Sequence, residues 1–141
     1  MKPDFFQLHG RETPARAADI RARFGVPVIK ALPVSEPGDL EQAAVYGDIA
    51  EMFLFDAPPA AEAARPGGLG AAFDWRILRD RRFARPWLLA GGLTPENVAR
   101  AINVSGAQMV DVSSGVESAP SLKSESRIAE FVAAAKQPVR A

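Results

Sequence analysis

The stretch Asp111-Val112-Ser113-Ser114-Gly115-Val116-Glu117 decides the fold that the sequence predicts. Met109-Val110-Asp111-Val112 reads as a strand, and Ser113-Ser114-Gly115 ends it and opens a loop. Two glycine-bearing loops precede it, at Gly91-Gly92 and at Gly67-Gly68-Leu69-Gly70. Glycine allows close approach and positive φ, and backbone N–H groups at loop ends bind anions. We therefore expect these loops to cluster at one end of a parallel sheet and to bind a phosphate group.

The rest of the chain repeats a strand–helix unit. Apolar runs of strand length end at His9, Leu32, Asp56, Ala90 and Ser113, and helix-like segments separate them. The run at 52–55 is continuously hydrophobic, as is typical of parallel strands buried on both faces. We find no hairpin signal between the units. The pattern predicts an α/β fold with a parallel sheet of five strands and right-handed crossovers. It leaves two architectures open, which are an open doubly wound sheet and part of a (βα)8 barrel.

Capping residues place several of the helices. Thr13 is a candidate N-cap with Pro14 in the first turn, and Gly25 can end that helix in a left-handed conformation. Thr94 and Pro95 predict a second helix start in the same way, and Asp74 can cap a helix through Trp75, Ile77 and Leu78. A last helix is expected near 124–135, with Ile128, Phe131, Val132 and Ala135 on one face.

Composition narrows the class of protein. With 141 residues a single domain is expected, and equal numbers of basic and acidic residues (17 each) give no electrostatic case for nucleic acid or a membrane as partner. The chain has no cysteine and one histidine, which excludes disulfides, thiolate catalysis and a multi-histidine metal site within it. No apolar run approaches the roughly 18 residues of a membrane span, and the first residues carry no signal-peptide pattern. We expect a cytoplasmic protein.

The motifs together resemble the C-terminal part of the phosphoribosylanthranilate isomerase family, a (βα)8-barrel enzyme of tryptophan biosynthesis. The motifs occur in family order and span nearly the whole chain. They are Gln7-Leu8-His9-Gly10, Val28-Ile29-Lys30-Ala31, Leu54-Phe55-Asp56, Gly67-Gly68-Leu69-Gly70 with Phe73-Asp74-Trp75, Leu89-Ala90-Gly91-Gly92-Leu93-Thr94-Pro95-Glu96-Asn97-Val98, and Asp111 to Glu117.

The resemblance implies that residues 1–141 form a partial (βα)8 TIM barrel whose parallel strands correspond to barrel strands 4 to 8. The first three βα units have no counterpart here, and a complete barrel usually needs about 200 residues or more. Five strands cannot close a barrel of normal size. We expect open sheet edges that lead to self-association or to pairing with a missing N-terminal segment.

The family catalyses the Amadori rearrangement of N-(5'-phosphoribosyl)anthranilate without a metal or an organic cofactor. By resemblance Asp56 is the general acid, and His9 and Asp111 line the substrate site. The phosphosugar substrate would be held at its phosphate by Gly68, Gly70, Gly91, Gly92, Ser114 and Gly115.

Two functional groups of the family have no counterpart in this sequence. They are a general-base cysteine after the first barrel strand and an arginine after the second, which holds the anthranilate carboxylate. We therefore expect the chain alone to be inactive or nearly so. A non-catalytic sugar-phosphate-binding module or a gene remnant is the alternative.

A purely structural role remains open for each of these candidate residues. Asp56 could cap a loop, the glycines could be turn residues, and His9 could be a hydrogen-bonded residue at a strand end. Asp111 could instead satisfy backbone groups. One residue departs from the family pattern, because Ser121 stands where the family usually has glycine.

Overall fold

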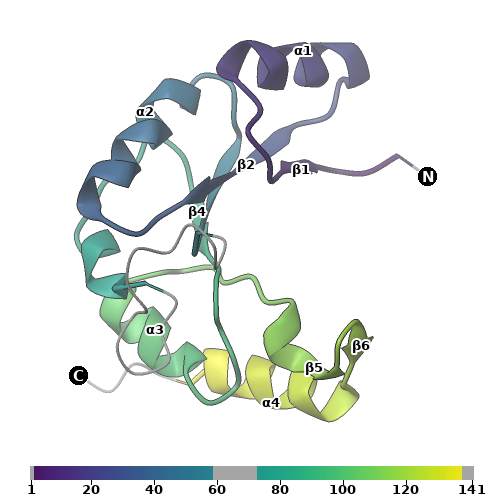
Figure 1. Cartoon of the computed structure of the whole chain (residues 1–141), viewed down its shortest axis with the longest axis vertical. Helices are drawn as coiled ribbons and strands as arrows, with labels where there is room; N and C mark the ends of the chain where they lie inside the picture. The colour runs from purple at the N-terminus through teal and green to yellow at the C-terminus, as the bar shows by residue number, and fades with distance from the viewer. Residues whose placement is uncertain (1, 59–72, 138–141) are drawn as a thin grey trace.

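The computed structural model describes residues 2–58 and 73–137, which form a parallel β-sheet with helices along one side (Figure 1). The four strands lie in sequence order, and each pairs in parallel with the next. They are β1 (Phe6–Leu8), β2 (Val28–Pro33), β3 (Met52–Asp56) and β4 (Trp87–Leu89). The predicted α/β class is confirmed.

The helices follow one another in an arc around the outside of the sheet, from α1 to α4 (Figure 1). Short 3₁₀ turns connect several of them. The α-helices are α1 (Pro14–Phe24), α2 (Gln42–Tyr46), α3 (Val98–Ser105) and α4 (Glu125–Ala135), and the 3₁₀ turns are η1 (Pro37–Glu41), η3 (Trp75–Leu78) and η4 (Ser114–Val116).

Helix α1 begins and ends where the capping residues predicted. The Thr13 hydroxyl accepts a hydrogen bond from the Arg16 N–H at 3.2 Å, and Pro14 is the first helical residue. Gly25 has φ 61° and donates its N–H to the Arg21 carbonyl at 2.9 Å. Both ends of the helix therefore have partners for backbone groups that the helix itself leaves free.

Helix α3 begins later than predicted. Thr94 and Pro95 lie in a turn, and the first helical residue is Val98. The Asn97 side chain closes this turn, because its Oδ1 accepts from the Thr94 N–H and its Nδ2 donates to the Gly92 carbonyl, both at 2.8 Å. The helix predicted after Asp74 is likewise only the 3₁₀ turn η3, although Asp74 caps it as predicted by accepting from the Arg76 N–H.

The fifth strand, predicted at 109–112, is not a regular strand. The segment runs parallel to β4 but makes a single bridge, between Leu89 and Val110. Two hydrogen bonds carry it, from the Leu89 N–H to Met109 O at 3.0 Å and from the Asp111 N–H to Leu89 O at 2.9 Å. Among the described residues this segment therefore joins the sheet through a single bridge and not through a regular ladder.

A short antiparallel hairpin, which the sequence did not predict, follows η4. Its strands are β5 (Glu117–Ala119) and β6 (Leu122–Lys123). Pro120 and Ser121 form the turn, and Ser121 has φ 64°. Proline followed by a residue with positive φ is the pattern of a type II turn, which usually takes glycine at that second position. Because serine stands at position 121, the sequence did not indicate this turn. The positive φ explains why glycine suits this position.

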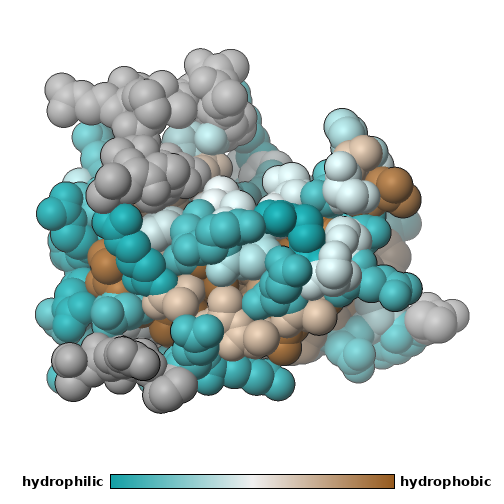
Figure 2. Space-filling view, turned by 90° about the horizontal axis from the view of Figure 1, so that it is seen from below, coloured by the Kyte–Doolittle hydropathy of each residue, from teal (hydrophilic) through white to brown (hydrophobic). Residues whose placement is uncertain are grey.

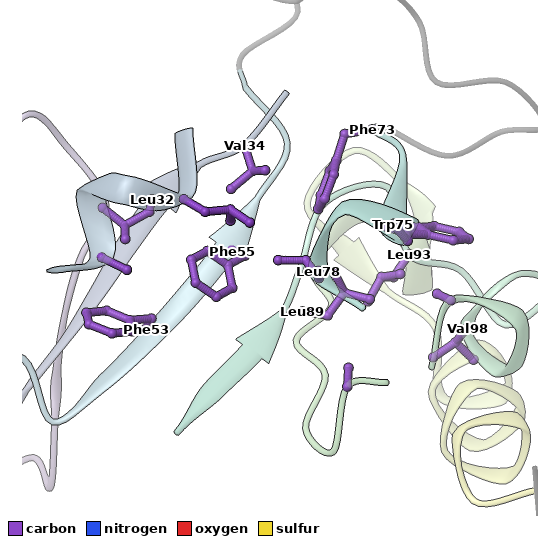
Figure 3. Packing of buried hydrophobic residues seen from close by; sticks show 14 of the residues in the cluster. Leu32, Val34, Phe53, Phe55, Phe73, Trp75, Leu78, Leu89, Leu93 and Val98 are labelled. Carbon is purple, nitrogen blue, oxygen red and sulfur yellow. The ribbon is translucent and has the colours of Figure 1, made fainter. Parts of the chain in front are cut away.

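The main core lies between the sheet and the helices. Large apolar side chains of β2, β3 and β4 meet residues of η3 and α3 there, as Figure 3 shows for Phe55, Leu78, Leu89 and Val98. Phe53 and Phe55 are fully buried. Trp75 and Phe131 also belong to this core. The other side of the sheet carries a smaller cluster of Ala31, Leu54 and Ala90.

Apolar side chains are exposed at both ends of the arc of helices. Near β1, Phe24 is 54% exposed and Phe5 is 38% exposed. On α4, Ile128 is 41% and Val132 is 43% exposed, so of the apolar face predicted for that helix only Phe131 is buried. Figure 2 looks from below at the end that carries α4 and shows apolar patches among hydrophilic side chains. No helix in the described part of the chain is long and apolar enough to cross a membrane.

Candidate active site

A cavity of about 370 Å³ lies at the carboxyl ends of the parallel strands. Such ends are where α/β folds place their sites. Gly68 and Gly70 lie outside the described residues. All the other residues that the sequence predicted for the site line this cavity, namely His9, Asp56, Gly91, Gly92, Asp111, Ser114 and Gly115.

His9 and Asp56 are in direct contact. His9 Nε2 lies 2.9 Å from Asp56 Oδ2, and the other carboxylate oxygen accepts the Ala57 N–H at 2.8 Å. The Asp56 side chain is 22% exposed and that of His9 is 54% exposed, so both can reach a ligand in the cavity. The carboxyl ends of β1 and β3 thus each place one polar side chain at the same point.

Gln7 is a site residue that the sequence reasoning did not single out. Its Nε2 lies 3.2 Å from His9 Nδ1. An amide nitrogen only donates, so a neutral His9 in this arrangement accepts at Nδ1 and carries its proton on Nε2, facing Asp56. The alternation of side chains along a strand places residues 7 and 9 on one face, and that signal could have identified Gln7.

Asp111 is a carboxyl group of the cavity with a raised pKa. Burial raises its pKa above the ordinary value, and the negative charge of Asp56 raises it further, while His9 acts weakly in the opposite direction. The carboxyl group of Asp111 therefore holds its proton more tightly than an exposed aspartate does.

Gly91 and Gly92 allow the chain that follows β4 to turn close to the end of β3. Both have positive φ, 86° and 64°. A Cβ at position 91 would lie 2.6 Å from Asp56 Oδ1 and 2.9 Å from Ala57 Cβ. Gly115 is similarly confined, because a Cβ there would overlap the carbonyl of Leu93. Side chains are excluded at these points, which leaves the backbone to line the cavity.

Two cations hold the 113–115 loop from outside the cavity. Lys123 Nζ donates to Ser113 O at 2.9 Å and to Ser113 Oγ at 3.1 Å, and Arg127 donates to Gly115 O at 3.1 and 3.2 Å. In a trans peptide the C=O of one residue points opposite to the N–H of the next. The N–H of Ser114 therefore points away from Lys123, an orientation suited to an anion on the other side. Lys123 was not predicted from sequence as a site residue.

A wider groove of about 1100 Å³ lies at the opposite end of β4, lined by Arg79, Arg81 and Arg82 among others. These arginines are exposed to solvent. The groove lacks the paired carboxyl and histidine of the smaller cavity. Among the described residues no group of three or more histidine, aspartate or glutamate side chains could hold a metal ion.

Comparison with known proteins identifies relatives across almost the whole chain. Residues 1–134 match the family model for N-(5'-phosphoribosyl)anthranilate (PRA) isomerase. A protein of that name from Paracoccus denitrificans is 56% identical over 136 residues, which cover 96% of this chain and 63% of the relative. The corresponding protein from Beijerinckia indica is 52% identical, over 98% of this chain and 62% of the relative.

Solved structures give the same result. The crystal structure of phosphoribosylanthranilate isomerase from Thermotoga maritima matches with a TM-score of 0.76 at 38% identity, over 94% of this chain and 62% of that one. A second crystal structure, a complex with reduced 1-(o-carboxyphenylamino)-1-deoxyribulose 5-phosphate, matches with a TM-score of 0.73 at 38% identity, over 94% and 59%. The chain thus spans a little under two thirds of the length of these relatives. It belongs to the N-(5'-phosphoribosyl)anthranilate isomerase family.

Proposed function

We propose that this chain is the C-terminal portion, residues 1–141, of a cytoplasmic enzyme that isomerises N-(5'-phosphoribosyl)anthranilate in tryptophan biosynthesis. The observation that carries the proposal is the cavity in which His9, Asp56 and Asp111 face glycine loops. This arrangement combines a carboxyl group for proton transfer with bare backbone for a phosphate.

Asp56 is the general acid in this proposal. It protonates the furanose ring oxygen, the C1'–O bond breaks, and the ring opens to a Schiff base. A base then removes the C2' proton, and the resulting enol amine becomes the ketone of the product. The contact with His9 fixes the Asp56 side chain, and Asp111 lines the same cavity.

His9 and Asp111 contact the sugar, and the glycine loops hold the phosphate. Gly91, Gly92, Ser114 and Gly115 line the cavity, and Gly68 and Gly70 complete this set by resemblance. A phosphate subsite formed by the loops after the last two strands is common in TIM barrels. The outward anchoring of the 113–115 loop by Lys123 and Arg127 supports this role.

The architecture we propose is the part of a (βα)8 barrel that holds strands 4 to 8. Exposed apolar side chains at both ends of the helix arc, on α1 and α4, support it. In a closed barrel each helix packs between two others, so neighbouring βα units would cover those ends. A segment with barrel strands 1 to 3 is therefore the partner we propose, and pairing between copies through the open edges would compete with it.

The general base and the arginine for the anthranilate carboxylate would come from that segment, because the family cysteine has no counterpart in a chain without cysteine. Loss of one positioned acid–base group typically costs about 10²- to 10⁴-fold in rate. We therefore propose that the chain by itself has almost no activity. The alternative, a non-catalytic module that binds sugar phosphates, would share the glycine loops but would not need Asp56.

Substitution of Asp56 separates the two functions. The chain is mixed with an N-terminal segment that carries the first three βα units of the Paracoccus denitrificans relative, and the loss of substrate fluorescence is followed. Asp56→Asn should lower kcat by roughly 10²- to 10⁴-fold, whereas Asp19→Asn, on the exposed side of α1, should not change it. Full activity of Asp56→Asn in this mixture would overturn the assignment of the acid.

A further inference from the structure

Lys30 is an almost fully buried lysine that the proposed reaction does not use. It is 2% exposed and lies in the middle of β2. It pairs with Phe53 of the main core, whereas its neighbour Ala31 pairs with Leu54 on the cavity side. Because side chains alternate along a strand, Lys30 and the cavity lie on opposite faces of the sheet.

The Lys30 ammonium binds the chain on both sides of His9. Its Nζ donates to Gly10 O at 2.9 Å and to Leu8 O at 3.3 Å. Its third hydrogen bond, at 3.0 Å, goes to Glu12 Oε2. All three acceptors belong to the end of β1 and the loop that leads into α1. An ammonium group has three donors and no acceptor, so these bonds satisfy it completely.

Glu12 and Tyr46 extend this anchor. Both carboxylate oxygens of Glu12 accept the Gly10 N–H at 3.1 Å. The Tyr46 hydroxyl of α2 donates to the Glu12 carbonyl at 2.7 Å. Burial opposes ionisation of Glu12, but its hydrogen bonds and the charge of Lys30 outweigh burial and lower its pKa. The loop is thus tied to β2 and α2 through residues far away in the sequence.

The His9 side chain has little packing of its own, because it is 54% exposed. Its direction depends on the backbone that carries it and on its two polar neighbours, Gln7 and Asp56. We propose that Lys30, together with Glu12 and Tyr46, is a positioning residue that holds His9 against Asp56 from the far face of the sheet. The expected effect on kcat rests on the proposed function. The expected effect on the His9 side chain rests on the geometry alone.

For the reaction, loss of Lys30 should lower kcat and leave substrate binding unchanged. A misplacement of about 1 Å in a catalytic group can cost on the order of 10²-fold in rate. Lys30 touches no part of the cavity, so its loss leaves the phosphate loops as they are. Lys30→Met should therefore lower kcat at least about tenfold and change KM by less than about twofold.

His9 offers a readout that does not need turnover, because it is the sole histidine of the chain. Its imidazole nitrogens give one pair of signals in a ¹⁵N NMR spectrum. In the parent chain, neutral His9 should show one fixed tautomer with the proton on Nε2, held between Gln7 and Asp56. In Lys30→Met the two nitrogen shifts should move toward each other, since the tautomers then exchange.

Arg21→Met is the matched control. Arg21 also ties α1 to backbone carbonyls, Asp48 O at 3.3 Å and Ile49 O at 3.1 Å, but at the other end of the helix. Its loss should lower the thermal midpoint and leave the His9 spectrum and kcat per active molecule unchanged. Tyr46→Phe, which removes a single hydrogen bond, should shift the His9 signals in the same direction as Lys30→Met but less. That variant keeps the test decisive if Lys30→Met does not fold.

Two results would overturn the inference. One is a parent-like His9 spectrum in both Tyr46→Phe and a folded Lys30→Met. The other is an equal spectral change in Arg21→Met, which would assign Lys30 to general stability. If the chain forms a stable complex with the N-terminal segment and this complex has no turnover, the proposed function fails, and the spectra still decide whether Lys30 positions His9.

Discussion

Gly91 lies so close to Asp56 that a Cβ atom at position 91 would be 2.6 Å from Asp56 Oδ1. The two residues come from the ends of neighbouring strands, β4 and β3. One residue belongs to the proposed phosphate site and the other is the proposed acid. This contact couples the phosphate loop to the position of the acid, so a change in one displaces the other.

Gly91→Ala should therefore reduce activity by more than its backbone strain implies. Gly106 has a similar φ, 78° against 86°, but a Cβ there meets nothing within 4 Å. Both alanine variants should lose roughly 1–3 kcal/mol of stability from the left-handed conformation, and Gly91→Ala should lose more, because its Cβ would also meet the backbone N and the Cβ of Ala57. Only Gly91→Ala should also lower kcat in the mixture with the N-terminal segment, by about 10- to 100-fold. Equal kcat values for the two variants would show that Asp56 is not displaced.

Lys123→Met tests the phosphate site. Lys123 anchors Ser113 and pairs with Glu117 Oε1 at 2.6 Å. Without Lys123 the 113–115 loop should become more mobile. It should then bind the phosphate group less well, and equally so in the substrate complex and in the transition state. We expect KM to rise about tenfold with kcat nearly unchanged, the pattern of lost uniform binding. Lys136→Met, at the exposed end of α4, is the control. An unchanged KM in Lys123→Met would place the phosphate elsewhere.

Asp111→Asn should stabilise the folded chain at neutral pH. The pKa of Asp111 is raised by burial and by the charge of Asp56. Its contribution to stability is thus fully present below the ordinary value of about 3.8 and is lost as pH rises through the raised value. Asparagine mimics the protonated form and avoids this loss. The difference between variant and parent in urea unfolding should be seen at pH 7 and vanish near pH 3.

Asp74→Asn should change stability at pH 7 in the opposite direction to Asp111→Asn. The hydrogen bond from the Arg76 side chain lowers the pKa of Asp74, and burial only partly opposes this. Its stabilising contribution is present above the ordinary value and is lost as pH falls through the lowered value. Asp74→Asn should therefore be slightly less stable than the parent at pH 7. If Asp111→Asn also proves less stable at pH 7, the carboxylate of Asp111 is stabilised in the fold and our reading of the cavity is wrong.

Phe55→Ala tests the core. Phe55 is fully buried, with ring centroids of Phe83 and Trp87 at 4.7 and 5.6 Å. Removal of a buried phenylalanine side chain costs about 3–5 kcal/mol. Phe24→Ala, at a position that is 54% exposed, should cost under about 1 kcal/mol. Similar losses in urea unfolding for both would mean that the sheet-to-helix core does not carry the stability of this chain.

Much of the site could be predicted because its residues follow strands. The carboxyl ends of parallel strands share one edge of a sheet, so His9, Asp56 and Gly91 had to meet once the strands were placed. The caps of α1, Thr13 and Gly25, were predicted for a local reason. Their side chain and backbone conformation act within four residues, where a sequence pattern is informative.

The rest depends on partners that are distant in sequence or on unusual local choices. Lys30 interrupts an apolar run, and its acceptors Leu8 and Gly10 lie 22 and 20 residues away. Asn97 delays α3 through two hydrogen bonds that compete with the cap expected at Thr94. Ser121 adopts a positive φ that serine seldom takes. None of these is visible to a search for periodicity and caps.

The most direct test is the rate at which substrate fluorescence is lost with the chain alone and with the chain plus the N-terminal segment of the Paracoccus denitrificans relative. Complex formation is measured separately by analytical ultracentrifugation. We predict the background rate for the chain alone and saturable turnover for the complex. Equal turnover with and without the segment would contradict the claim that the base lies outside this chain, and a stable complex without turnover would contradict the proposed isomerase function itself.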